Sequence, residues 1–139
     1  MRLLVKSCGH KDCQFHRQDS NNNGKKNVKF KGYEEISGVK WGTIKHGATR
    51  RNLEFNITLE YIWELFLKQD KKCALTGIDI YFGRTNTKET TASLDRIDST
   101  KGYIVGNVHW VHKTVNIIKM DLELNEFISW CKLIAKKFS

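Results

Sequence analysis

Residues 91–119 read TASLDRIDSTKGYIVGNVHWVHKTVNIIK, and this stretch decides the fold that the sequence predicts. Its pattern indicates a strand over residues 91–94, a loop that contains Gly102, a second strand, and a helix that begins near His112. The stretch is dense in polar side chains that bind metals or phosphates. They are Asp95, Arg96, Asp98, Asn107, His109, His112, Asn116 and Lys119. The pattern therefore predicts a strand–loop–strand–helix unit that carries a functional site.

Two oxygen-bearing side chains of this unit, Asp95 and Asn116, are candidate ligands of a hard divalent cation. Asp95 ends the first predicted strand and Asn116 lies in the predicted helix, so the fold brings them together. Mg²⁺ and Mn²⁺ prefer oxygen ligands, and two protein ligands leave positions open for water and a phosphate. Such a cation stabilises the charge that develops when a phosphodiester is hydrolysed. The two residues therefore favour a metal-dependent hydrolytic site.

Three other residues of the stretch are expected to support this site. Asn107 precedes the core of the second strand and is expected to hydrogen-bond the backbone of the loop. Gly102 is expected to supply a turn conformation that a bulkier residue would resist. Lys119 lies one turn beyond Asn116 on the same helix face, from which we expect it to reach a phosphate.

The composition favours a polyanionic partner. The chain has 139 residues, enough for one domain or one domain with a small appendage, and 40% of them are hydrophobic. It carries 24 Lys and Arg against 15 Asp and Glu, and each phosphate that a cation neutralises releases counterions. A merely soluble basic domain is the alternative. The sequence has no apolar run that predicts a signal peptide or a membrane span, so we expect a cytoplasmic location in a prokaryotic or phage-infected cell and no membrane partner.

A predicted helix over residues 38–51, capped by Ser37, carries most of the expected DNA contacts. Its apolar positions form one stripe and consist of Val39, Trp41, Ile44 and Ala48. Its other face is basic and consists of Lys40, Lys45, His46, Arg50 and Arg51. A charged helix face is ordinarily just solvated, but a face of a single sign favours contact with phosphates.

Further elements are predicted on both sides of the central unit. Short strands are expected over residues 28–33, 53–57 and 78–82. A helix capped by Thr58 is expected over residues 59–69, with an inward face that consists of Ile62, Trp63, Phe66 and Leu67. Asn125 is expected to cap a terminal helix over residues 126–138. One face of that helix is apolar, which predicts a buried Cys131, and consists of Phe127, Cys131, Ile134 and Phe138. The predicted fold class is α+β.

Residues 92–119 resemble the HNH endonucleases, also called ββα-metal or His-Me finger nucleases. The likeness is greatest to small phage-type members and to rare-cutting restriction enzymes with the same Asp-Arg pair, and it continues more weakly over residues 41–135. It implies a ββα-metal core with flanking helices, DNA as substrate, and Mg²⁺ or Mn²⁺ as cofactor. It also implies that Asp95 and Asn116 bind the metal and that Asn107 is the framework asparagine of the motif.

The sequence departs from the family at the position of the general base. The histidine that usually follows the metal-binding aspartate is Arg96 here, and a guanidinium cannot accept a proton at neutral pH. Arg96 can instead clamp the scissile phosphate in a bidentate manner. We expect His109 to be the base, since it shares a strand face with Asn107, although an exposed histidine without a catalytic role fits equally well. The other candidates are Tyr103, Tyr81, His46 and hydroxide formed on the metal.

A second departure concerns zinc. Many relatives brace the motif with two CxxC knuckles, but of the corresponding positions here only Cys73 is a cysteine. The other three positions hold Thr76, His112 and Val115. One Cys and one His are too few for a structural zinc, so we expect apolar packing to hold the core. The residues expected to do so are Leu75, Leu94, Trp110, Val111 and Ile117.

The predicted N-terminal extension, residues 1–37, contains a separate candidate metal site. Cys8, His10, Cys13 and His16 follow one another closely, but their spacing is not a common zinc-finger spacing. The alternatives are a zinc knuckle and a loop with buried cysteines and exposed histidines, followed by a flexible polar loop over residues 18–27. The remaining residues, 38–139, are expected to form the nuclease domain.

The sequence thus predicts a metal-dependent DNA endonuclease, of the restriction or homing kind, that nicks or cuts duplex DNA. One alternative is a DNA-binding module of the same fold with impaired catalysis, for which Arg96 would be the symptom. Another is a nuclease specific for branched DNA or RNA. A homodimer would suit double-strand cleavage, but the sequence marks no convincing dimer surface.

Overall fold

The structure is a computed structural model that describes residues 31–83 and 89–139, and the contacts divide the chain between Phe30 and Lys31. The antiparallel strands β1 (Gly32–Tyr33) and β2 (Ile36–Ser37) therefore belong to the larger unit, to which β2 contributes the fully buried Ile36. This boundary lies earlier than the predicted one after residue 37. The N-terminal cluster of Cys8, His10, Cys13 and His16 lies outside the described residues, so zinc binding there stays a prediction.

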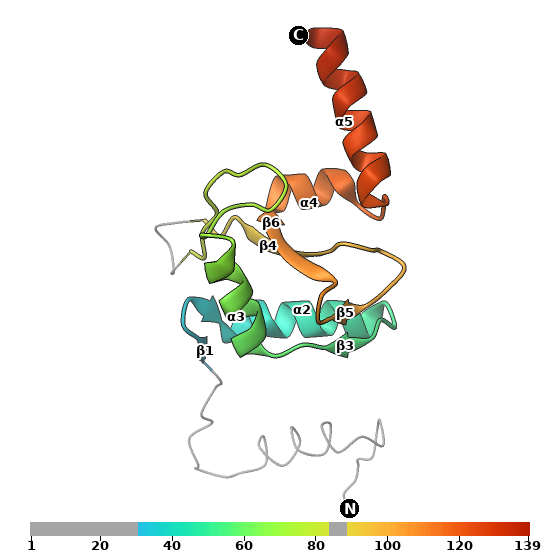
Figure 1. The fold of residues 1–139 in the computed structure, drawn as a ribbon. Coiled ribbons are helices and arrows are strands. Elements are labelled where there is room, and N and C mark those ends of the chain that lie inside the picture. The colour runs from blue at the N-terminus through green and yellow to red at the C-terminus, as the bar shows by residue number, and fades with distance from the viewer. Residues whose placement is uncertain (1–30, 84–88) are drawn as a thin grey trace, which may run out of the picture. The chain divides into compact units, whose positions relative to one another are not determined.

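The predicted strand–loop–strand–helix unit is present and lies at the centre of the larger unit (Figure 1). β4 (Ala92–Arg96) pairs in antiparallel register with β6 (Val108–His112), and the chain passes directly into α4 (Lys113–Lys119). His112 caps α4, since its Nδ1 accepts a hydrogen bond of 3.2 Å from the Thr114 N–H. The surrounding elements are α2 (Gly38–Arg50), β3 (Phe55–Asn56), α3 (Leu59–Lys68), β5 (Tyr103–Ile104) and α5 (Leu124–Phe138).

The core is built where α3 packs against β6. Trp110 of β6 is fully buried, and its ring meets those of Phe66 and Phe82 edge-on. Its Nε1 donates a hydrogen bond of 2.7 Å to the Ile62 carbonyl. The Gln69 side chain then bonds both the N–H and the C=O of Trp110, each at 2.8 Å. These contacts join α3 to β6, and they confirm the predicted inward positions of Ile62 and Phe66.

The loop between β4 and β6 is held by Asn107, as the sequence predicted. Its Nδ2 donates to the carbonyls of Asp98 and Gly102, and its Oδ1 accepts from the Asp98 N–H. Gly102 does not supply the special turn conformation that was expected of it, because its φ is not positive. A Cβ at this position would lie 2.3 Å from the Glu54 carbonyl oxygen, so glycine is needed where β5 approaches the chain before β3. The Tyr103 N–H donates to that same oxygen at 2.8 Å.

We therefore predict opposite effects of alanine at two glycines. Gly102→Ala should lower the free energy of unfolding by about 1–3 kcal/mol, because the backbone of Glu54 would have to move. Gly42→Ala, in α2 with no atom near the added Cβ, should raise it by up to about 1 kcal/mol. Urea unfolding of both variants measures this, and equal effects would contradict the packing described for Gly102.

Three apolar assignments and one strand differ from the prediction. Val39 and Ile117 are mostly exposed rather than part of the core, and Leu67 is nearly half exposed. The buried face of each of these helices is therefore narrower than the apolar face that its sequence suggests. Residues 78–82 do not form a strand; a single bridge pairs Lys72 with Asp79.

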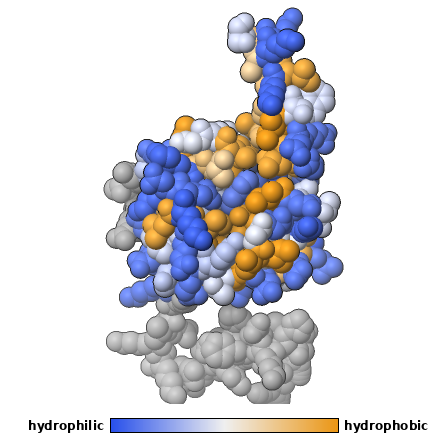
Figure 2. Space-filling model, viewed as in Figure 1, coloured by the Kyte–Doolittle hydropathy of each residue, from blue (hydrophilic) through white to orange (hydrophobic). Residues whose placement is uncertain are grey.

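The terminal helix α5 differs most from the prediction. It begins two residues earlier than expected and is capped by Glu123 in place of Asn125, since the Glu123 carboxylate accepts from the N–H groups of Asn125 and Glu126. Cys131 is exposed, and Ile134 and Phe138 are 59% and 83% exposed. The prediction of a buried Cys131 is therefore wrong, because α5 extends away from the core after Phe127. Figure 2 shows apolar side chains on α5 and on the surface at its base.

The two cysteines of the described residues should differ in reactivity. Cys131 on α5 should react with a maleimide within minutes in the folded protein, whereas Cys73 in the core should react only after denaturation. Peptide mass spectrometry after timed labelling distinguishes the two positions. Protection of Cys131 equal to that of Cys73 would show that α5 is covered in solution.

Among residues 31–83 and 89–139, no helix is both long and apolar enough to cross a membrane.

Candidate active site

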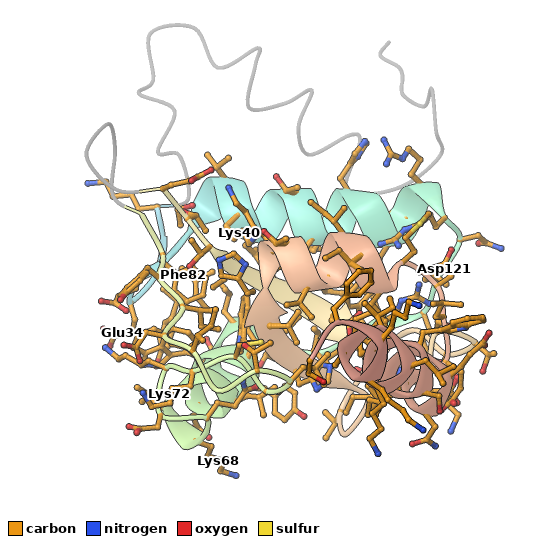
Figure 3. The ribbon with its side chains drawn as sticks, turned by 90° about the horizontal axis from the view of Figure 1, so that it is seen from above. Glu34, Lys40, Lys68, Lys72, Phe82 and Asp121 are labelled. Carbon is orange, nitrogen blue, oxygen red and sulfur yellow. The ribbon has the colours of Figure 1, made fainter. Side chains whose placement is uncertain are left out.

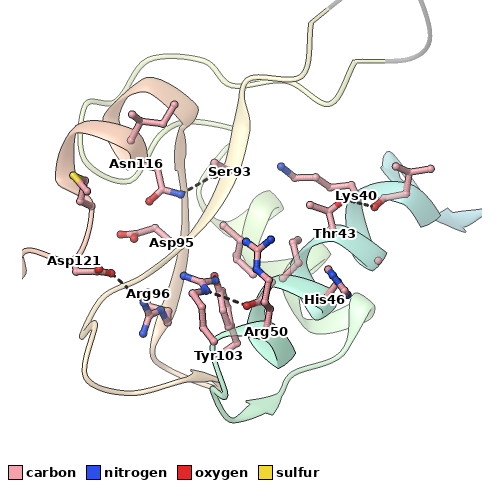
Figure 4. A pocket seen from close by; sticks show the side chains of 18 residues that line it. Lys40, Thr43, His46, Arg50, Ser93, Asp95, Arg96, Tyr103, Asn116 and Asp121 are labelled. Carbon is pink, nitrogen blue, oxygen red and sulfur yellow. Dashed lines mark hydrogen bonds and ion pairs between the residues drawn. The ribbon is translucent and has the colours of Figure 1, made fainter. Parts of the chain in front are cut away.

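A cavity of about 910 Å³ lies between α2, β4 and α4 (Figure 4). It brings the predicted metal ligands Asp95 and Asn116 together with Arg96 in one wall. The opposite wall is α2, which contributes most of its predicted basic residues. These are Lys40, His46, Arg50 and Arg51. Residues that are far apart in the sequence thus meet around one polar cavity.

Asp95 is 5% exposed and is held from two sides. It lies directly opposite His109 in the β4–β6 pairing, and His109 Nε2 is 3.0 Å from its Oδ2. The Nζ of Lys119 is 3.3 Å from each carboxylate oxygen. His109 is buried and does not line the cavity, so its place suits a residue that positions Asp95 better than the predicted general base. The strand pairing explains this, because opposed residues share one face of the ribbon.

Lys119 does not occupy the place predicted for it. It is 0% exposed, and its Nζ also donates to the Arg96 carbonyl at 3.2 Å. It follows Asn116 by almost one helical turn and so faces β4, as Asn116 does. The expected contact with a DNA phosphate at the surface does not fit this burial.

Asn116 is fixed by a residue that the prediction missed. Its Nδ2 donates a hydrogen bond of 2.8 Å to Ser93 Oγ, which leaves the amide oxygen as the atom available to a cation. Ser93 precedes Asp95 by two positions in β4, so the strand period that places both on one side was visible in the sequence. The carboxylate and amide oxygens fit a hard divalent cation, with the remaining positions left to water and substrate. The described residues hold no group of three His, Cys, Asp or Glu side chains that could bind a metal.

Arg96 is mainly engaged by the loop that follows it. Its Nη1 donates to the carbonyls of Ser99 and Lys101 at 2.6 and 2.9 Å. Its Nη2 forms a longer ion pair of 3.5 Å with Asp121, whose side chain is 84% exposed. A bidentate clamp through both terminal nitrogens would break the loop bonds, so Nη2 is the part of Arg96 that a phosphate can reach. No sequence signal pointed to Asp121, which approaches through the turn after α4.

Tyr103 lines the cavity between two arginines. Its hydroxyl oxygen accepts a hydrogen bond of 2.9 Å from Arg51 Nη2. The guanidinium carbons of Arg51 and Arg96 both lie 5.8 Å from the centre of its ring. His46, on the α2 wall, also lines the cavity, whereas Tyr81 does not. Of the predicted bases, Tyr103 and His46 are therefore the two that face the cavity.

The basic face of α2 is divided between the cavity and the outer surface. Lys45 does not line the cavity, and its Nζ lies 5.9 Å from the centre of the Trp41 ring. Lys40 is at the cavity, where burial and then repulsion from Lys113 lower the pKa of its ammonium group. Burial and this repulsion both disfavour the charged form of Lys40. An anion bound beside Lys40 would therefore stabilise that charged form.

The residues at the positions of the family's zinc knuckles also lie together. Burial raises the pKa of the Cys73 thiol, but hydrogen bonds from the Thr76 side chain and from backbone groups, including that of His112, hold the pKa below its ordinary value. Cys73 and the nearby Leu94, Trp110 and Val111 are buried. Apolar packing is present here as predicted.

Comparison with known proteins supports the fold. No protein-family model matches the chain. It is similar to the rare-cutting HNH restriction endonuclease PacI, with a TM-score of 0.53 and 19% sequence identity over 84% of this chain and 92% of that structure. The chain has an HNH-like fold.

Two viral proteins share sequence with the chain. An uncharacterized 29.0 kDa protein from the dda–modA intergenic region of Enterobacteria phage T4 is 35% identical over 88 residues, which are 63% of this chain. Uncharacterized protein R423 of Acanthamoeba polyphaga mimivirus is 29% identical over 106 residues, which are 76% of this chain. The chain spans only 34% and 18% of the lengths of these two proteins.

Proposed function

We propose that this chain is a metal-dependent endonuclease that hydrolyses phosphodiester bonds in DNA. The observation that carries the proposal is the meeting of two oxygen ligands, Asp95 and Asn116, with a basic helix across one cavity. The HNH-like fold supports it, as does the net charge of +9. The T4 and mimivirus relatives are consistent with a role in phage-infected cells.

The residues in and behind the cavity would have different roles in such a reaction. Asp95 and Asn116 would hold a Mg²⁺ or Mn²⁺ ion, which supplies Lewis acid chemistry at the phosphate when bound. His109 orients the carboxylate of Asp95, and Ser93 orients the amide of Asn116. Arg96 would exchange its exposed partner Asp121 for the phosphate through Nη2.

Tyr103 is the best-placed acceptor for the proton of the attacking water, once its own hydroxyl proton has passed to solvent and left the phenolate. Tyr103 lines the cavity, and its oxygen accepts a hydrogen bond from the cationic Arg51, which would stabilise negative charge on that oxygen. His46 also lines the cavity, but within residues 31–83 and 89–139 no hydrogen bond to another side chain holds its ring in one orientation. We therefore assign the base to Tyr103 and keep His46 as the competing residue.

Loss of either metal ligand should abolish cleavage. We expect relaxation of supercoiled plasmid with Mg²⁺ or Mn²⁺, none with EDTA, and none by Asp95→Ala or Asn116→Ala. Asp79→Asn is the matched control, because Asp79 is an exposed carboxylate paired with Lys72 away from the cavity. Robust cleavage by either ligand variant would refute the site.

The choice of base predicts a second difference. Tyr103→Phe removes only the hydroxyl and should lower the cleavage rate by about 10²–10⁴-fold, the usual contribution of a general base, with DNA binding retained. His46→Gln should lower the rate much less. Single-turnover cleavage measures both rates, and the reverse ranking would assign the base to His46.

The basic wall predicts how binding responds to salt. Lys40→Gln should weaken DNA binding and lower the slope of log Kd against log salt by about 1, because one phosphate contact is lost. Lys68→Gln is the control, since Figure 3 places Lys68 on the side away from Lys40. Equal slopes for both variants would contradict the assignment of α2 to DNA.

A second candidate function is a DNA-binding module without catalysis. The engagement of Arg96 Nη1 by loop carbonyls favours it, because it gives this arginine a structural role. Salt-dependent binding without cleavage in either metal would support the module. Comparison of duplex, junction and RNA substrates would separate the nuclease for branched DNA or RNA from both.

A further inference from the structure

Lys119 is the most unusual charged residue of the described chain. Lysine is almost never fully buried unless it is paired, and Lys119 has no exposed surface. Its ammonium group reaches both oxygens of Asp95 at 3.3 Å and the Arg96 carbonyl at 3.2 Å. It comes from the last turn of α4, the helix that also carries Asn116. The ammonium group of Lys119 therefore lies next to Asp95, one of the two proposed metal ligands.

The charges around the cavity act in the same direction. Among the described residues, the carboxylates that line it are Asp95 and Asp121, and Asp121 is paired with Arg96. Four basic side chains line it as well: Lys40, Arg50, Arg51 and Arg96. With Lys119 added behind Asp95, the walls carry more positive than negative charge. A divalent cation in this cavity would share the Asp95 carboxylate with Lys119 and would meet several other positive charges.

A DNA phosphate reverses this balance. It brings negative charge to the cationic wall and offers an oxygen ligand to the cation. Binding of phosphate and binding of metal should then favour each other, and by thermodynamic linkage each should raise the affinity for the other by one common factor.

We propose that Lys119 is a positioning residue that holds the Asp95 carboxylate in place and lowers the affinity of that carboxylate for metal. The free protein then binds a divalent cation weakly, and the complex with DNA binds it tightly. This inference rests on the proposed function. It explains why a lysine, and not a neutral side chain, fills the space behind Asp95. The proposed coupling keeps the site from holding metal before a phosphodiester is present.

Binding of Mn²⁺, followed by the electron paramagnetic resonance signal of the free ion, tests the proposal without cleavage. The affinity is measured for the wild-type protein alone and with a short duplex that carries phosphorothioate linkages, with the duplex alone as blank. We expect the duplex to tighten Mn²⁺ binding by a factor in the range of about 5–150-fold that is usual for coupled sites. Equal affinities with and without duplex would overturn the proposal.

Two variants then assign the coupling to Lys119. Lys119→Met removes the charge but keeps the length, and it should tighten binding of Mn²⁺ to the free protein by about ten-fold or more and reduce the effect of the duplex. Lys72→Met, at an exposed lysine that is paired with Asp79 away from the cavity, should change neither affinity. Unchanged Mn²⁺ affinity in folded Lys119→Met would overturn the role of Lys119. If Lys119→Met does not fold, Lys119→Gln takes its place with the same expected and contradicting results, because a glutamine amide carries no charge but can still donate to Asp95 and to the Arg96 carbonyl.

The outcome is distinguishable from failure of the proposed function. If Asp95→Ala abolishes plasmid cleavage while Mn²⁺ binds the wild-type protein equally with and without duplex, the nuclease stands and the coupling is wrong. If Asp95→Ala cleaves as the wild type does, the nuclease site itself is wrong.

Discussion

The pairing of β4 with β6 is the constraint on which the site depends. Its register sets Asp95 opposite His109 and leads directly into α4, which returns Asn116 and Lys119 to the same carboxylate. A shift of one residue would turn Asp95 to the other face of the ribbon and leave the buried Lys119 without its carboxylate partner. Trp110 lies in the middle of β6, and the Gln69 side chain bonds both its backbone N–H and its backbone C=O. These bonds oppose a shift in register.

The second wall of the cavity depends on a contact between distant parts of the chain. Gly102 allows β5 to approach the backbone of Glu54, and Tyr103 then meets Arg51 at the end of α2. This contact places a basic helix opposite Asp95 and Asn116. In the proposed reaction the helix would bind the phosphodiester, and the opposite wall would carry its hydrolysis. The buried charges of one wall and the cations of the other thus define one electrostatic site.

Local pattern predicted the two strands and helix of the motif, α2 and α3, because strand and helix periods decide which side chains share a face. It also predicted that Asp95 and Asn116 meet, and both line one cavity, whereas their binding of metal stays a prediction. The burial of Lys119 was not predictable, since it depends on which face of α4 meets β4. Nor was the contact of Tyr103 with Arg51, which spans 52 positions. The exposed Cys131 shows the same limit: an apolar stripe predicts burial only if another element covers it.

The central claim, that Asp95 and Asn116 form one site for a divalent cation, is tested most directly by paramagnetic broadening of backbone amide signals with trace Mn²⁺. This method detects weak binding and needs no cleavage. We predict that broadening centres on β4 around Asp95 and on α4 around Asn116 and is lost in Asp95→Ala. Broadening centred on exposed carboxylates such as Asp79, with the β4 and α4 signals sharp, would contradict it.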